Sequence, residues 1–148
     1  MTEPALIPSF LHTDFGGIKK TDKAKVKKSI DHTYLTGDID KYYEQTYPED
    51  HRWDYVIHNT SKHRIAFFEI HEASTSGFSE VKKKYLWLKD MIRVKASELN
   101  YYKNKPDLEF YWIWTDKNKF KNPNTPQYKE WKTSKEIKHI KLQDSLNI

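Results

Sequence analysis

Apolar positions along the chain fall into short runs and one long helical stripe. The runs at about 53–58 and 64–71 are joined by the polar turn 59–63, a pattern that predicts a β-hairpin. Between about 79 and 98 apolar residues recur every three or four positions, which predicts the strongest helix of the chain. The central part of the chain therefore reads as two paired strands followed by a helix.

The segments on either side give weaker patterns. A helix is predicted from Asp22 to Leu35, because Val26, Ile30 and Tyr34 fall at helical spacing and Gly37 can end it. The other predicted elements are a helical turn within 38–52, a strand at 108–115, a short helix at 127–136 and a last strand at 137–142.

Helices and strands in this mixed order predict an α/β (α+β) fold with a central mixed β-sheet flanked by helices. The segment 65–70 is apolar up to its acid, which is typical of a central strand that is covered on both faces. A chain of 148 residues suits one domain over 1–148, with a core at about 22–142 and an N-terminal arm at 1–20.

Composition narrows the function classes. The chain has no cysteine, which excludes disulfides and thiolate metal sites, and it has no apolar run of the ~18 residues that a membrane helix needs. Its first residues lack the pattern of a signal peptide, so we expect a cytoplasmic protein without membrane contact. The net charge of +5 favours nucleic acid as the partner, while a homodimer or a partner protein stays open.

Two acids stand inside the predicted hairpin strands, where burial of a carboxylate is costly unless it is paired, protonated or metal-bound. Strand alternation places Glu69 and His71 on one face, and Asp54 lies opposite Glu69 if Asn59 pairs with Arg64. Opposed residues lie ~5 Å apart at Cβ, so the two carboxylates need a cation or a proton between them. A hard divalent cation, Mg²⁺ or Mn²⁺, suits such oxygen ligands.

Asp54, followed fifteen residues later by Glu69-Ile70-His71, resembles the signature of the restriction-endonuclease-like, PD-(D/E)XK nuclease superfamily. The order of elements over about 22–115 resembles the core of that family as well. The resemblance implies that Asp54 and Glu69 bind the metal, that the backbone carbonyl of Ile70 is a third ligand, and that residue 71 contacts the attacking water.

The sequence departs from the family pattern at the third position, where His71 stands in place of lysine, and at Trp53, where a proline is frequent. His71 can bind metal or act as a base, because its unperturbed pKa of ~6.5 leaves a neutral fraction at pH 7. A lysine of the following helix, Lys82, Lys83 or Lys84, can also supply the missing group.

These observations predict a nuclease-like protein, a Mg/Mn-dependent endonuclease that hydrolyses phosphodiester bonds in DNA or RNA. The alternative is a catalytically inactive nucleic-acid- or protein-binding module of the same fold, with the loop at 117–121 contacting phosphates. Asp31 could be the outer acid that some family members place on the first helix, although a capping or surface role is favoured.

Overall fold

The computed structural model describes residues 6–114, 120, 122, 124–141 and 146–148, and a six-stranded sheet dominates it. The strand order is β1-β3-β4-β5-β6-β7, with antiparallel neighbours from β1 to β5 and parallel neighbours from β5 to β7. These strands are β1 (Leu11–Thr13), β3 (Tyr34–Asp38), β4 (Tyr55–Asn59), β5 (Arg64–His71), β6 (Glu109–Trp114) and β7 (Lys138–Lys141).

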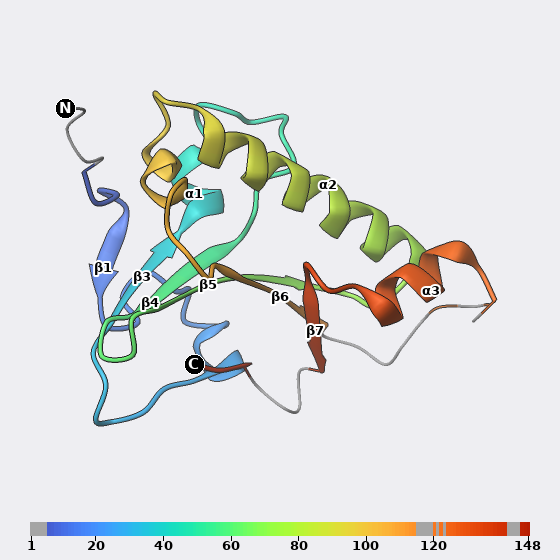
Figure 1. Ribbon diagram of the computed structural model, residues 1–148, viewed down its shortest axis with the longest axis horizontal. Helices are drawn as coiled ribbons and strands as arrows, with labels where there is room; N and C mark the ends of the chain where they lie inside the picture. The colour runs from blue at the N-terminus through green and yellow to red at the C-terminus, as the bar shows by residue number, and fades with distance from the viewer. Residues whose placement is uncertain (1–5, 115–119, 121, 123, 142–145) are drawn as a thin grey trace.

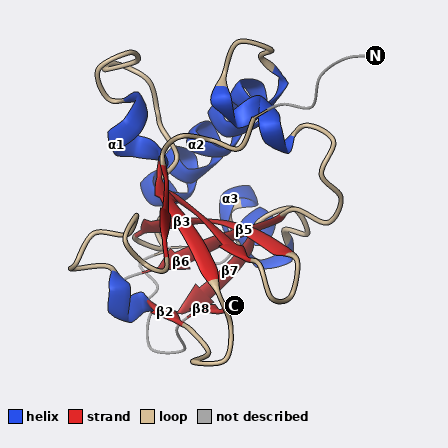
Figure 2. Cartoon of the chain, turned by 90° about the vertical axis from the view of Figure 1, so that its left-hand side faces the viewer, coloured by secondary structure: helices blue, strands red, loops and turns tan. Residues whose placement is uncertain are grey.

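The α-helices of the described residues pack on one face of this sheet, with α2 running across it (Figure 1). The opposite face is covered by loop segments and a small two-stranded parallel sheet (Figure 2). The helical elements are η1 (Lys23–Lys25), α1 (Ile39–Tyr43), α2 (Thr75–Arg93), η2 (Glu98–Tyr102) and α3 (Pro126–Thr133), and the small sheet pairs β2 (Val26–Lys27) with β8 (Leu146–Asn147).

Strand β5 lies between two hydrophobic cores. On the α2 side Phe67 packs in a core that includes Leu88, and on the other side Phe68 packs in a core that includes Val26. Both phenylalanines are fully buried, which confirms the prediction of a central strand covered on both faces. The predicted α+β class with a mixed sheet is confirmed, although the α-helices gather on one face.

The hairpin and the long helix are confirmed close to their predicted positions. Strand β5 runs from Arg64 to His71 as predicted, while α2 begins four residues earlier than expected, at Thr75. It begins there because the hydroxyl of Ser74 accepts a hydrogen bond from the N–H of Gly77 at 2.9 Å and so caps the helix.

The predicted helix over 22–35 is wrong. That segment holds the short turn η1, the strand β2 and the first residues of β3, and Ile30 is 96% exposed rather than part of an apolar stripe. Like charges three to four residues apart, such as Lys23 and Lys27, disfavour a helix there. The expected irregular arm also differs, because it contributes strand β1 and the buried residues Phe10, Phe15 and Ile18.

Candidate functional site

Asp54 and Glu69 lie opposite each other at the open end of the β4–β5 hairpin. Asn59 pairs with Arg64 and Tyr55 with Phe68, so one further step along the ladder brings Asp54 to Glu69, as predicted. The backbone N–H of Asp54 donates to Glu69 Oε2 at 2.9 Å. The N–H of Ile70 donates to Asp54 Oδ2 at 3.0 Å. One oxygen of each carboxylate is therefore fixed by the main chain.

Lys84 of α2 reaches the remaining oxygens of both acids. Its Nζ lies 3.7 Å from Asp54 Oδ1 and makes a short ion pair with Glu69 Oε1. Strand alternation places Glu69 on the same face of β5 as Phe67, which packs in the core on the α2 side, so a side chain of α2 can reach it. Asp54 lies immediately before β4, Glu69 lies on β5 and Lys84 lies on α2.

Burial controls the electrostatics of this cluster. The side chain of Glu69 is fully buried, while those of Asp54 and Lys84 are each 20% exposed. Burial raises the pKa of Glu69 well above its usual value, and repulsion by Asp54 adds to the rise. Burial also raises the pKa of Asp54, against the lowering effect of Lys84. Both carboxyl groups therefore demand a nearby positive charge in order to stay ionised.

Lys84 supplies that charge in the structure as it stands. Burial alone lowers the pKa of its ammonium group, but attraction by Glu69 and Asp54 outweighs burial, so the pKa lies above the usual value. The ammonium group is accordingly charged at neutral pH, lies beside two carboxylate oxygens and is partly open to solvent.

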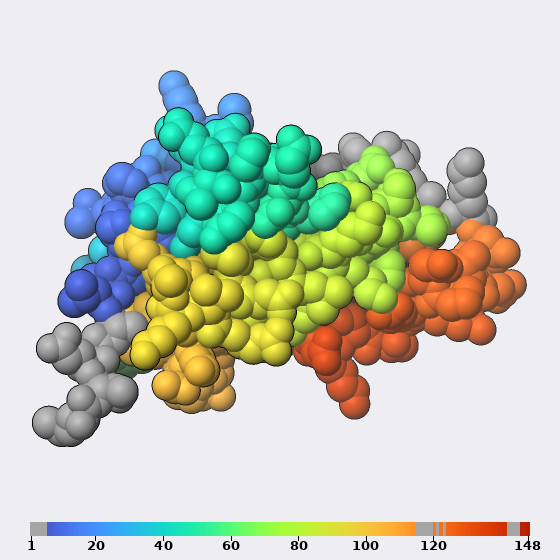
Figure 3. Space-filling view, turned by 90° about the horizontal axis from the view of Figure 1, so that it is seen from above, coloured from blue at the N-terminus to red at the C-terminus, as the bar shows by residue number. Residues whose placement is uncertain are grey.

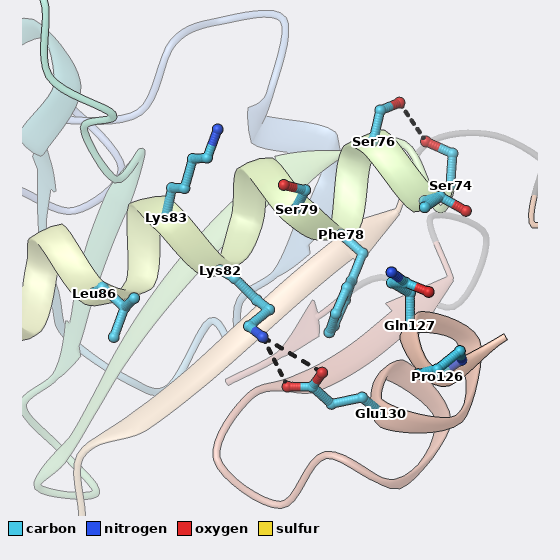
Figure 4. A pocket seen from close by; sticks show the side chains of 11 residues that line it. Ser74, Ser76, Phe78, Ser79, Lys82, Lys83, Leu86, Pro126, Gln127 and Glu130 are labelled. Atoms are coloured by element: carbon cyan, nitrogen blue, oxygen red, sulfur yellow. Dashed lines mark hydrogen bonds and ion pairs between the residues drawn. The ribbon is translucent and has the colours of Figure 1, made fainter.

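The other two candidate lysines lie away from the acids. Figure 4 shows Lys82 reaching Glu130 of α3, at 3.1 Å, while Lys83 extends from α2 away from α3. The Lys83 Nζ lies 3.7 Å from Glu80 on its own helix. In Figure 3 the 40–55 segment and α3 lie on opposite sides of α2, so lysines on different sides of this helix have different neighbours.

His71 stays on the strand face of Glu69 by alternation, next to Trp114 in the register of β5 with β6. Its Nδ1 accepts a hydrogen bond from the N–H of Glu72 at 3.0 Å. Neither a hydrogen bond nor an ion pair joins His71 to Asp54 or Glu69, all of which the structure describes. The lysine that contacts these two acids in the structure belongs instead to α2.

The arginines among the described residues bind other groups than Asp54 and Glu69. Arg52 pairs with Asp40, Arg64 with Glu109, and Arg93 with Asp90. Among the described residues Lys84 is accordingly the cation that contacts the two acids.

Asp40 is a third acid near the site, and sequence reasoning missed it. Its N–H and that of Ile39 donate to the carbonyl of Asp54, at 3.4 and 2.9 Å, which docks the start of α1 onto the site. Arg52 holds the Asp40 carboxylate at 2.8 Å. Asp31, the outer acid considered from the sequence, lies in the turn before β3, away from the site. Nearby, the N–H of Thr60 donates a hydrogen bond to the carbonyl of Thr33, which places this turn at the opposite end of the hairpin from Asp54 and Glu69.

Some predictions fall outside what the structure tests. The lysines proposed for phosphate contact in the 117–121 loop lie outside the described residues. Among the described residues no group of three or more His, Cys, Asp or Glu side chains is arranged to hold a metal. None of the helices in the described part of the chain has both the length and the apolarity that crossing a bilayer requires.

Comparison with known proteins gives no family model, no curated protein and no solved structure that matches this chain.

Proposed function

We propose that the protein is a divalent-metal-dependent phosphodiesterase that acts on nucleic acid. The observation that carries this proposal is the convergence of Asp54, Glu69 and Lys84 at one end of the sheet. Two carboxylates and one lysine are the side chains that the restriction-endonuclease-like signature requires, and here the lysine comes from α2 instead of β5. The substitution of His71 for lysine is thereby compensated in space.

The arrangement of the strands supports the same class. Strands β3, β4 and β5 form an antiparallel meander, α2 follows, and β6 returns parallel to β5. This order resembles the core of the restriction-endonuclease-like fold. The proposal extends this likeness from the arrangement of the strands to the chemistry of the site.

The donor set fits a hard divalent cation. Asp54 Oδ1 and Glu69 Oε1 are the carboxylate oxygens that face Lys84, whereas their partner oxygens accept backbone hydrogen bonds. Mg²⁺ and Mn²⁺ bind through one or two carboxylates and keep several waters, so two protein oxygens suffice. The backbone carbonyl of Ile70, next to Glu69, stays the proposed third ligand.

The roles of the residues follow from their charges and positions. When bound, the metal would polarise the phosphoryl oxygen and lower the pKa of the attacking water. Asp54 and Glu69 would hold it, because their other oxygens are already fixed by the main chain. The ammonium of Lys84 would donate to a phosphate oxygen or orient the water, since its raised pKa keeps it charged.

A second candidate is a non-catalytic nucleic-acid- or protein-binding module of the same fold. The observation in its favour is that the ammonium of Lys84 already contacts both acids and offsets part of their negative charge without a metal. In that case the triad would serve to join α2 to the hairpin, and binding would not depend on Asp54 or Glu69.

Cleavage assays separate the two candidates. Wild-type protein should cleave at least one of single- and double-stranded DNA and RNA in the presence of Mg²⁺ or Mn²⁺. The isosteric variants Asp54→Asn and Glu69→Gln should lose cleavage, whereas Glu80→Gln, which alters a partly exposed acid of α2 that does not contact the site lysine, should keep it. Circular dichroism should show that each variant is folded. Full activity in Glu69→Gln, or no cleavage by the wild type, would refute the nuclease proposal.

A further inference from the structure

The formal charge of the chain is concentrated in one segment. Residues 19–28 hold six of the 26 basic residues and one of the 21 acidic residues. The rest of the chain therefore carries 20 of each and is formally neutral, so the net charge of +5 resides in these ten residues. We call residues 19–28 the lysine segment.

Most of these charges face solvent and form no ion pair with a described residue. Two lysines of the segment make ion pairs, Lys25 with Asp22 at 2.8 Å and Lys28 with Asp14 at 2.6 Å. The other four are exposed, and none of them makes an ion pair with a residue that the structure describes: Lys19, Lys20, Lys23 and Lys27. Such a cluster repels itself unless an anion approaches it.

The segment is held firmly against the sheet rather than hanging free. Just before it, the N–H of Gly17 donates to Thr36 Oγ1 at 2.8 Å, and a Cβ at Gly17 would lie 2.2 Å from the carbonyl oxygen of Thr36. Within it, Val26 is 4% exposed in the core opposite α2. The lysine segment thus lies on the sheet face opposite α2 (Figure 2).

Its position brings it to the same end of β4 as the two acids. Asp22 Oδ2 accepts a hydrogen bond from the hydroxyl of Tyr55 at 2.6 Å. Tyr55 directly follows Asp54, and strand alternation sends its side chain to the opposite face. The charge of Lys19 also acts on Asp38, the residue that caps α1 beside the site.

We propose that the lysine segment binds the sugar-phosphate backbone of a nucleic acid and guides it toward Asp54 and Glu69. The guidance toward Asp54 and Glu69 rests on the proposed nuclease function, whereas the binding of the backbone does not. Lysine ammonium groups are point charges without acceptor atoms, so binding should be independent of base sequence and strongly dependent on salt.

A membrane surface is the less suitable polyanion. Ile30 borders the segment and is 96% exposed, but a helix that lies in a membrane interface needs a continuous apolar face opposite its basic one. Residues 19–28 form a 3₁₀ turn and a two-residue strand, and their apolar residue Val26 is buried inside the protein.

Fluorescence anisotropy with labelled single- and double-stranded DNA and RNA tests this surface, in EDTA so that no metal-dependent cleavage occurs. The test variant carries Lys19→Gln, Lys20→Gln, Lys23→Gln and Lys27→Gln. The control variant carries Lys95→Gln, Lys103→Gln, Lys129→Gln and Lys135→Gln, which change the net charge equally at exposed positions elsewhere. The test variant should bind more weakly, and for duplex its log–log salt slope should flatten by about 0.9 per lysine that contacts a phosphate.

Three results would overturn the inference: no nucleic-acid binding by the wild type, an equal loss of affinity in both variants, or binding only to vesicles that contain phosphatidylserine. Parallel cleavage assays keep it distinct from the nuclease proposal. Cleavage by the wild type, together with equal binding by both variants, would refute the proposed role of the lysine segment and leave the nuclease proposal standing. Selective loss of binding in the test variant, without cleavage by the wild type, would support the lysine segment as a binding surface and refute the nuclease proposal.

Discussion

The backbone N–H of Asp54 donates to the carboxylate of Glu69 at 2.9 Å, across the open end of the hairpin. This bond fixes the orientation of a fully buried acid and leaves its second oxygen directed at Lys84. The two acids are therefore held by main-chain N–H groups at the open end of the hairpin, and α2 adds the cation. A change at Lys84 should consequently alter the charge of the site while the hairpin keeps its shape.

Replacement of Lys84 by methionine should destabilise the protein and expose the metal-binding capacity of the two acids. Removal of one partner from a buried ion pair costs about 3–5 kcal/mol, because the remaining charges stay buried without compensation. Mn²⁺ can then replace the lost positive charge, so it should raise the melting temperature of Lys84→Met by more than that of the wild type. Urea denaturation and thermal shift with and without Mn²⁺ measure both effects.

Lys83→Met is the matched control, because Lys83 is the neighbouring residue of α2 and pairs with the partly exposed Glu80. Exposed pairs contribute about 0–1 kcal/mol, so this variant should resemble the wild type in stability and in its response to Mn²⁺. If Lys84→Met gained no stabilisation from Mn²⁺, the two acids would be no metal site, whatever the cost of the substitution.

The sequence was sufficient to predict the pair of acids but not the rest of the site. The register of Asp54 with Glu69 follows from local pattern, because two apolar runs and one short turn fix how the strands align. The choice of Lys84 among three successive lysines depends on the phase of α2, which its cap at Ser74 and its core-facing residues set together.

Asp40 and strand β3 were missed for a different reason. Asp40 comes near the site because α1 docks on the carbonyl of Asp54, and such a contact leaves no trace in the local sequence. In β3, Gly37 weakened the strand signal, yet a glycine is required there because a Cβ would lie 2.5 Å from the ring of Phe10. Gly37 was also expected to end the predicted helix over 22–35, which the structure does not contain.

His58 should make the protein less stable as the pH falls from about 6.5 to about 4. Its ring is buried, with Nε2 2.6 Å from the hydroxyl of Tyr102, and burial lowers its pKa from 6.5 to about 4. Below pH 6.5 the unfolded chain takes up this proton before the folded chain does, so the free energy of unfolding decreases. The loss attributable to His58 should approach about 3 kcal/mol near pH 4.

Urea denaturation of the wild type and of His58→Gln at several pH values isolates this contribution, since glutamine can keep a hydrogen bond to Tyr102 but does not titrate. The difference between the two proteins should change with pH only below about pH 6.5. His12→Gln, an exposed histidine on β1, serves as the control and should follow the wild type. Parallel curves for the wild type and His58→Gln would show that His58 titrates normally.

Tyr55→Phe should loosen the lysine segment while it leaves the acids in place. The hydroxyl of Tyr55 donates to Asp22 at 2.6 Å, and a hydrogen bond to a charged group contributes about 1.5–3 kcal/mol. Its loss frees Asp22 and Lys25 from the sheet, so amide hydrogen exchange over residues 19–28 should become faster and nucleic-acid binding weaker.

Tyr111→Phe is a closely matched control, because it removes a 2.6 Å hydrogen bond to Glu109 from a second buried tyrosine on the same face of the sheet. Two outcomes can be distinguished. Similar losses of stability in both variants, with faster exchange and weaker binding only in Tyr55→Phe, would show that the anchored segment is the binding surface. Equal weakening of binding in the two variants would instead assign the effect to general destabilisation of the sheet.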